Sequence, residues 1–114
     1  MAQEQEPANP INEVMARMPT VFQPNKAAGE TATIQFNFTG AEPGNWVIEI
    51  ADGKCEVSEG IADKPSITIN APSEVWLKIS RQEMNGATAF MTGKFTFKGD
   101  MGVLMKMPGW FGQD

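Results

Sequence analysis

The sequence predicts an α+β fold: a two-layer sandwich in which helices cover one face of a five-stranded, largely antiparallel sheet. Several segments alternate apolar and polar residues with a period of two, as strands with one buried face do. Short turns containing glycine join successive strands, which favours antiparallel neighbours. Other segments place apolar residues at helical spacing, so each helix has one apolar side to lay against the sheet.

The first predicted helix follows a polar, acidic stretch at residues 1–8, which we expect to be a disordered tail. Asn9 is a suitable N-cap, and Pro10 suits the first helical position. Apolar residues then recur at i, i+3, i+4 and i+7, namely Ile11, Val14, Met15 and Met18. We expect Pro19 to end this helix and residues 20–29 to form a helical connector.

Three strands are predicted to follow as a meander. In TATIQFNFT, Ile34, Phe36 and Phe38 lie on one face, and polar residues lie on the other. The segment NWVIEIA has the same period, and the Asp-Gly pair at residues 52–53 is a strong hairpin signal that leads into KCEVS. A fourth strand is predicted at residues 66–70, with both isoleucines facing inward.

A two-residue hairpin turn would pair Ile50 with Cys55 and Glu49 with Glu56. The first pair makes Cys55 a small buried hydrophobe rather than a nucleophile, because the chain has no His to activate it. The glutamate pair would suit acid/base chemistry only if an apolar pocket raised the pKa of one carboxyl group. Opposed like charges on a sheet are more often a solvated pair, so we expect no catalytic residue here.

A helix is predicted to begin at Pro72 or Ser73, with Val75, Trp76 and Ile79 on its apolar face. This helix should end before the Asn-Gly turn that follows it. We expect Trp76 and Ile79 to face the same interior as the strands.

The stretch TAFMTGKFTFKGDMGVLMKM, residues 88–107, contributes a strand and a helix on either side of one glycine. Asp100 is a plausible cap for the helix. Apolar residues alternate in the strand and recur at helical spacing in the helix: Phe95, Phe97, Met101, Leu104 and Met105. We expect the Pro-Gly pair at residues 108–109 to stop the helix, leaving Trp110 and Phe111 on a short tail that folds back or lies exposed.

Two interpretations of this stretch remain open from its residues. The spacing alone favours two pieces of an ordinary core. The choice of side chain favours an apolar cavity with a methionine-rich wall, because methionine is unbranched, adaptable and common on surfaces that accept variable partners.

Composition excludes several classes of function. A net charge of −5 and a pI near 4.7 argue against nucleic acid and against an anionic membrane surface, both of which are held mainly by Lys and Arg. The chain has no His and no Tyr, which removes the commonest acid/base groups and metal ligands. One cysteine excludes an intrachain disulfide and a multi-cysteine zinc site. We therefore expect no metal, no cofactor and no enzymatic activity.

Location and domain number follow from length and hydropathy. With 114 residues the chain is large enough for one core, so we expect residues 9–114 to form a single domain. No stretch reaches the ~18 consecutive apolar residues of a membrane span. The opening MAQEQEPANP has no basic region followed by an apolar one, so a cytoplasmic location is expected.

The pattern TIQFNFTG, then GNWVIEIADGKCEV, then SITI before a helix, and above all TAFMTGKFTFKGDMGVLMKM, resembles the sterol carrier protein type 2 family. The similarity covers about residues 10–107. It implies a lipid-binding tunnel between the sheet and the helices. The family is not enzymatic by itself and binds or transfers sterols, fatty acids, fatty acyl-CoA and phospholipids. Without a peroxisomal C-terminus and with the ending PGWF, the chain looks like a stand-alone bacterial member.

The resemblance also implies which residues border the tunnel. Those that match the family motif are Phe90, Met91, Phe95, Phe97, Met101, Leu104 and Met105. The last helix of the family acts as a lid, which would be residues 101–107 here. Trp76, Ile79 and Trp110, the last of which would plug the tunnel or guide a lipid, complete the candidate lipid-binding residues.

Three classes of function remain. The leading hypothesis is a module that binds lipid or fatty acyl ligands, with at most transient membrane contact and an unidentified partner enzyme. An accessory domain could instead dock a partner protein through its apolar face, and exposed Trp110 and Phe111 would suit that role. A small α+β enzyme acting on a hydrophobic substrate would need a buried Asp or Glu, because the chain has no His or Tyr.

Overall fold

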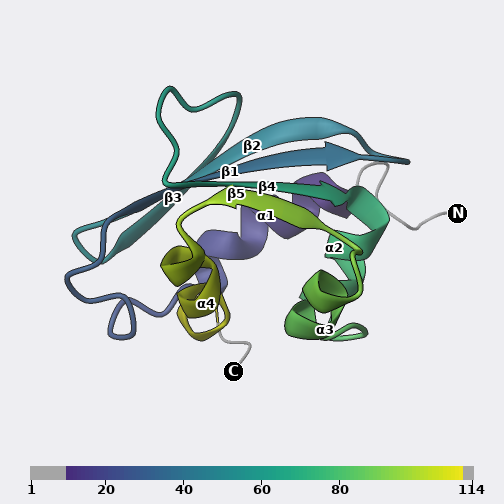
Figure 1. Ribbon diagram of the computed structural model, residues 1–114. Helices are drawn as coiled ribbons and strands as arrows, with labels where there is room; N and C mark the ends of the chain where they lie inside the picture. Colours follow the sequence, from purple (N-terminus) through teal and green to yellow (C-terminus); the bar gives the residue numbers. More distant parts are fainter. Residues whose placement is uncertain (1–9, 112–114) are drawn as a thin grey trace, which may run out of the picture.

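The computed structural model describes residues 10–111, which form one sheet with helices packed against one of its faces (Figure 1). The predicted tail at residues 1–8 and the predicted cap at Asn9 lie outside the described residues. The elements follow in the order α1 (Pro10–Val21), β1 (Ala32–Thr39), β2 (Gly44–Ala51), β3 (Lys54–Glu59), β4 (Ile67–Pro72), α2 (Ser73–Ser80), α3 (Gly86–Met91), β5 (Thr96–Gly99) and α4 (Met101–Trp110).

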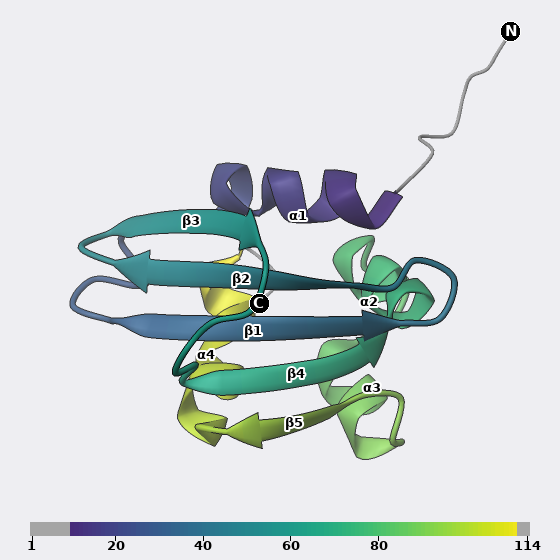
Figure 2. The same cartoon turned by 90° about the horizontal axis from the view of Figure 1, so that it is seen from above.

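The five strands lie in the order β3-β2-β1-β4-β5 (Figure 2). Three neighbouring pairs are antiparallel, and β1 and β4 run parallel. The parallel pair arises because the chain leaves β3 at one edge and crosses back to the free side of β1 before it enters β4. The predicted α+β fold with a mostly antiparallel sheet is thus confirmed.

The β2–β3 hairpin has the predicted two-residue turn. Asp52 and Gly53 both have positive φ, 55° and 72°, which is the backbone twist that joins two antiparallel strands most tightly. The turn sets the predicted register, with Ile50 opposite Cys55 and Glu49 opposite Glu56. Both glutamates are exposed, so their carboxylates are in water and not in an apolar pocket.

All four described helices pack on the same face of the sheet (Figure 1). The alternating apolar residues of the strands point to this layer and are almost fully buried, among them Ile34, Phe36, Ile48 and Ile69. The core therefore lies between the sheet and the helices.

The opposite face of the sheet is mostly polar but is not entirely in water. Gln35 is 3% exposed and Val47 is 7% exposed, because the connection from β3 to β4 folds over them. The amide of Gln35 holds this connection: Oε1 accepts a 2.6 Å hydrogen bond from the N–H of Ala62, and Nε2 donates to the carbonyl of Gly60 at 3.0 Å. The alternating pattern predicts one buried face per strand, and at this place the other face is buried as well.

Some predicted boundaries are wrong. The α1 helix continues past Pro19 to Val21, and α4 continues past Pro108 to Trp110. The ring of proline fixes φ near −65°, which is itself helical, so a proline in the last turn removes one hydrogen bond without ending the helix. Residues 24–29, predicted as part of a helical connector, form a series of turns instead, and β5 begins only at Thr96.

Among residues 10–111, no helix is both long and apolar enough to cross a bilayer.

Candidate functional site

A cavity of about 360 Å³ lies between the helices, and its described lining side chains are almost all apolar. Ligand pockets typically measure ~300–1,000 Å³, so this volume lies at the small end of that range. All four helices contribute to it, together with the residue that precedes β5. The lining residues are Met18, Trp76, Ile79, Asn85, Gly86, Ala87, Phe90, Met91, Phe95, Leu104, Met105, Met107, Pro108 and Phe111.

Aromatic rings form one wall of the cavity. The indole of Trp76, from α2, lies 4.8 Å from the ring of Phe36 and 6.4 Å from that of Phe95, centroid to centroid, and meets Phe95 edge to face. The ring of Phe90 lies 5.7 Å from that of Phe95 and 5.2 Å from that of Phe97. These distances are within the range in which aromatic pairs attract, so the wall links the sheet, α2 and α3.

Helix α3 forms one side of the cavity and is only six residues long. Oδ1 of Asn85 accepts a 3.0 Å hydrogen bond from the N–H of Thr88 and so caps the helix. Within the helix only Ala89 is fully buried. Gly93, with φ of 76°, turns the chain away towards β5. The side chains of α3 that face the cavity therefore rest on a short helix with one buried anchor.

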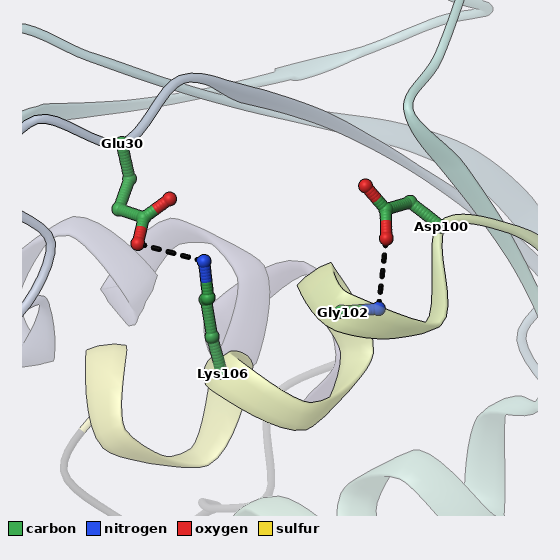
Figure 3. Close-up of polar contacts among 4 residues, drawn as sticks. All are labelled: Glu30, Asp100, Gly102 and Lys106. Atoms are coloured by element: carbon green, nitrogen blue, oxygen red, sulfur yellow. Dashed lines mark hydrogen bonds and ion pairs between the residues drawn. The ribbon is translucent and has the colours of Figure 1, made fainter.

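Helix α4 forms the other side; a cap fixes its first turn, and an ion pair joins its second half to another segment (Figure 3). Asp100 caps it as predicted, since Oδ1 accepts a 2.8 Å hydrogen bond from the N–H of Gly102. Further along, Nζ of Lys106 forms a 2.9 Å ion pair with Oε2 of Glu30.

The C-terminal end of α4 is also attached to the connector that follows α1. Gln23 donates from its backbone N–H to the carbonyl of Trp110 at 2.7 Å and from Nε2 to the carbonyl of Gly109 at 3.1 Å. The rings of Phe111 and Phe22 lie 5.7 Å apart. These contacts fix the end of α4 that lines the cavity through Met107, Pro108 and Phe111.

Two exposed methionines mark where the cavity opens. Met91 on α3 is 82% exposed and Met105 on α4 is 71% exposed, yet both line the cavity. The opening thus lies between α3 and α4, with one methionine on each side. An unbranched thioether chain can adopt many rotamers, which suits an opening of variable width.

No described lining residue carries a charge. Only two lining side chains can form hydrogen bonds: the amide of Asn85 and the indole of Trp76. Nε1 of Trp76 is buried and has no hydrogen-bond partner among the described residues. The described residues also contain no cluster of three or more His, Cys, Asp or Glu side chains that could hold a metal ion.

Cys55 does not line the cavity and has the surroundings of a structural thiol. It is partly buried and packs against the core. Burial raises the pKa of its thiol to about 11, and the neighbouring charge of Glu56 adds to this rise. A thiol with a raised pKa is a weak nucleophile near neutral pH, in agreement with the small hydrophobe that the sequence predicted.

Seven of the ten predicted lipid-binding residues line the cavity: Trp76, Ile79, Phe90, Met91, Phe95, Leu104 and Met105. The other three do not. Phe97 packs behind the wall against Phe90, Met101 is 51% exposed outside the cavity, and Trp110 is 2% exposed in the core. Whether the seven bind a lipid stays a prediction.

Sequence reasoning missed the lining residues of α1, of the α3 N-terminus and of the α4 C-terminus. Met18 was recognised as apolar, but no pattern tells which interior residue reaches a cavity. The Pro-Gly pair at residues 108–109 predicts a stop, which leaves Phe111 on a tail and not in the wall of a cavity. The tail is part of the core: Phe111 is 6% exposed, so the exposed Trp110 and Phe111 that a docking role would use are absent from the surface.

Comparison with known proteins places the chain in a family. A family model described as the SCP-2 sterol transfer family matches residues 11–112. Hydroxysteroid dehydrogenase-like protein 2 of Xenopus tropicalis is 28% identical over 107 residues, which are 93% of this chain and 26% of that protein. Sterol carrier protein 2 of Gallus gallus is 32% identical over 68 residues, 60% of this chain and 12% of that protein. The chain thus spans about a quarter of these curated relatives, or less.

Solved structures share the fold. Palmitated SCP2L2 from Aedes aegypti has a TM-score of 0.69 and 25% identity, with 87% of each chain covered. The sec-alkylsulfatase Pisa1 from Pseudomonas sp. has a TM-score of 0.72 at 18% identity, covering 87% of this chain and 15% of that one, and is similar in fold alone. Because the family model matches nearly the whole length of the chain, this protein belongs to the SCP-2 sterol transfer family.

Proposed function

We propose that this chain binds a hydrophobic lipid, such as a fatty acid, fatty acyl-CoA, phospholipid or sterol, in the cavity between α3 and α4 and transfers it without chemistry of its own. The apolar, uncharged wall of the 360 Å³ cavity carries this proposal. The family supports it, and so does the relative from Aedes aegypti, which is described as palmitated.

Energetics favour an occupied cavity. An empty, unrelaxed cavity costs ~24 cal/mol per Å³, so this one would cost at most about 9 kcal/mol. The whole stability of a domain is ~5–15 kcal/mol. Each buried CH₂ group of a ligand contributes ~0.8 kcal/mol, so an acyl chain can stabilise the open form without polar contacts.

We expect the carrier to act in the cytoplasm. A net charge of −5 disfavours lasting attachment to an anionic membrane, so contact with membranes should be transient, when the carrier takes up or releases lipid. A partner enzyme would receive the lipid from it.

The test is to denature the purified protein, extract it with organic solvent and identify lipids by mass spectrometry. We expect a lipid in stoichiometric amount. Delipidated protein should then melt at a higher temperature when saturating palmitate is added, because a ligand that binds only the folded state raises stability. No extracted lipid, together with a melt unchanged by palmitate, palmitoyl-CoA and cholesterol, would contradict the proposal.

A further inference from the structure

We infer that the cavity takes a single-chain lipid tail first and leaves the head group outside, so that the site selects for chain length and not for head-group charge. This inference rests on the proposed function and specifies its ligand class. It follows from the charge, the hydrogen-bonding groups and the size of the cavity.

The described lining residues offer no cation to an ionised head group. None of the described lining residues is Lys, Arg, Asp or Glu. A carboxylate or phosphate inside would lose its water without gaining a cation, and an uncompensated buried charge is strongly disfavoured. The lysines next to α3 and in α4 do not line the cavity. Lys106 forms an ion pair with Glu30, and Lys94 is exposed in the loop after α3.

The wall also offers little to a neutral polar group that enters first. Nε1 of Trp76 is buried within the aromatic wall and is inaccessible, so its N–H does not open into the cavity. The amide of Asn85 is exposed, and Oδ1 is already occupied by the N–H of Thr88. Asn85 is thus the one described lining residue that is exposed and has a side-chain N–H donor. Among the described lining side chains, a hydrogen bond is therefore available only at the exposed Asn85.

The volume fits one chain. A methylene group is about as large as a water molecule, whose share of liquid volume is ~30 Å³, so 360 Å³ holds on the order of a dozen such groups. Carbons beyond that number would lie between Met91 and Met105, where the cavity opens, and would remain partly in water. A second chain would require the helices to separate.

The experiment is displacement of cis-parinaric acid from delipidated protein by three matched series of eight to sixteen carbons: fatty acids, fatty alcohols and methyl esters. We expect the dissociation constant to fall about fourfold per added methylene up to about twelve carbons and less steeply beyond. At equal chain length, the dissociation constants of the three series should agree within about fivefold, because an exposed charge contributes no more than that to binding. Salt should have little effect on them.

One variant and its control sharpen the test. Ala87 is exposed and lines the cavity, so Ala87→Lys adds a cation at the opening without disturbing the core. It should tighten binding of fatty acids relative to alcohols, in a salt-dependent way, and leave the chain-length slope unchanged. The control is Ser58→Lys, at an exposed position on β3, which changes the net charge by the same amount. It should change neither the affinity for acids relative to alcohols nor the chain-length slope.

The outcomes are distinguishable. A native protein that binds acids more than about tenfold tighter than alcohols at equal length, as a buried ion pair would produce, overturns the inference but not lipid binding. Affinity that depends on the head group and not on chain length also overturns it. If no compound in any series displaces the probe or raises the melting temperature, the proposed function itself is wrong.

Discussion

Nζ of Lys106 lies 2.9 Å from Oε2 of Glu30, and this ion pair joins α4 to the connector between α1 and β1 (Figure 3). The pair links residues 76 positions apart in the sequence. Together with the two hydrogen bonds from Gln23 it gives α4 a fixed place beside the cavity. What each attachment contributes can be measured separately.

The ion pair should contribute little to stability. The side chains of Lys106 and Glu30 are 53% and 33% exposed, and exposed pairs contribute ~0–1 kcal/mol. Lys106→Met should therefore lower the free energy of unfolding by less than about 1 kcal/mol, with a smaller effect at high salt. A double-mutant cycle with Glu30→Gln in urea gives the coupling energy, and a coupling that survives high salt would argue against a screened surface pair.

The cap of α4 should contribute more. Replacing Asp100 by Ala removes the acceptor for the N–H of Gly102 and should cost about 1 kcal/mol, within the ~0.5–2 kcal/mol usual for N-caps. Asp100→Asn keeps an oxygen acceptor and is the matched control. Chemical denaturation of the two variants should separate them, and equal stability would mean that the cap contributes nothing.

Met105→Asp should weaken lipid binding more than it weakens the fold. Met105 lines the cavity but is 71% exposed, so a carboxylate there remains solvated while it faces the entering chain. The matched control is Ile61→Asp, because Ile61 is 70% exposed and does not line the cavity. Both variants should melt near the native temperature, and only the first should lose affinity for palmitate. Collapse of the Met105 variant would instead favour an ordinary core.

The thiol of Cys55 should react slowly. Because burial raises its pKa from 9.0 to about 11, the thiolate fraction below pH 9 falls about a hundredfold. Alkylation of the folded protein should be slower by about that factor than alkylation of the urea-unfolded chain, with a midpoint near pH 11.

The same shift affects stability. The folded state holds the thiol proton more tightly, so this contribution is fully present below pH 9.0 and is lost as the pH rises towards 11. The Cys55→Ala variant should lack this part of the pH dependence. Equal alkylation rates of folded and unfolded chains would show that the thiol is not desolvated.

Periodicity in the sequence predicted the order of elements, and together with the family resemblance it named seven of the fourteen described lining residues. Alternation decides which face of a strand is buried. It correctly predicted that Phe95 faces the interior, where its ring contacts those of Trp76 and Phe90. Periodicity says nothing about how deep a side chain lies, which explains why Phe97 and Met101 were predicted to line the cavity but do not. Phe97 has the right face but is shielded by Phe90, and Met101 has the right spacing but lies beyond the edge of the cavity.

The errors in the predicted ends of α1 and α4 have a physical cause. The sequence favours a stop at Pro19 and Pro108, because proline removes a hydrogen bond, yet tertiary packing outweighs that loss. A buried aromatic residue follows each proline within three positions: Phe22 and Phe111 pack on each other, and Trp110 is 2% exposed. The contact between these two distant segments is set by the whole fold and cannot be read from either segment.

The anchoring of α4 leads to a prediction about which side of the cavity moves. The family resemblance implied that residues 101–107 act as a lid, but α4 is attached through Lys106, Trp110 and Phe111. Helix α3 has six residues, one buried anchor and one cap at Asn85. Short segments with few buried contacts open at low free energy, so we expect α3 to be the more mobile side.

Native-state hydrogen exchange can decide between the two helices. Amides of α3 should exchange faster than those at the C-terminal end of α4 in the delipidated protein, and palmitate should protect α3 more. Asn85→Ala, which removes the cap, should speed exchange in α3 and release of lipid, while Asn85→Ser keeps an acceptor and is the control. Slower exchange in α3 than in α4, or protection by palmitate confined to residues 101–107, would instead identify α4 as the lid.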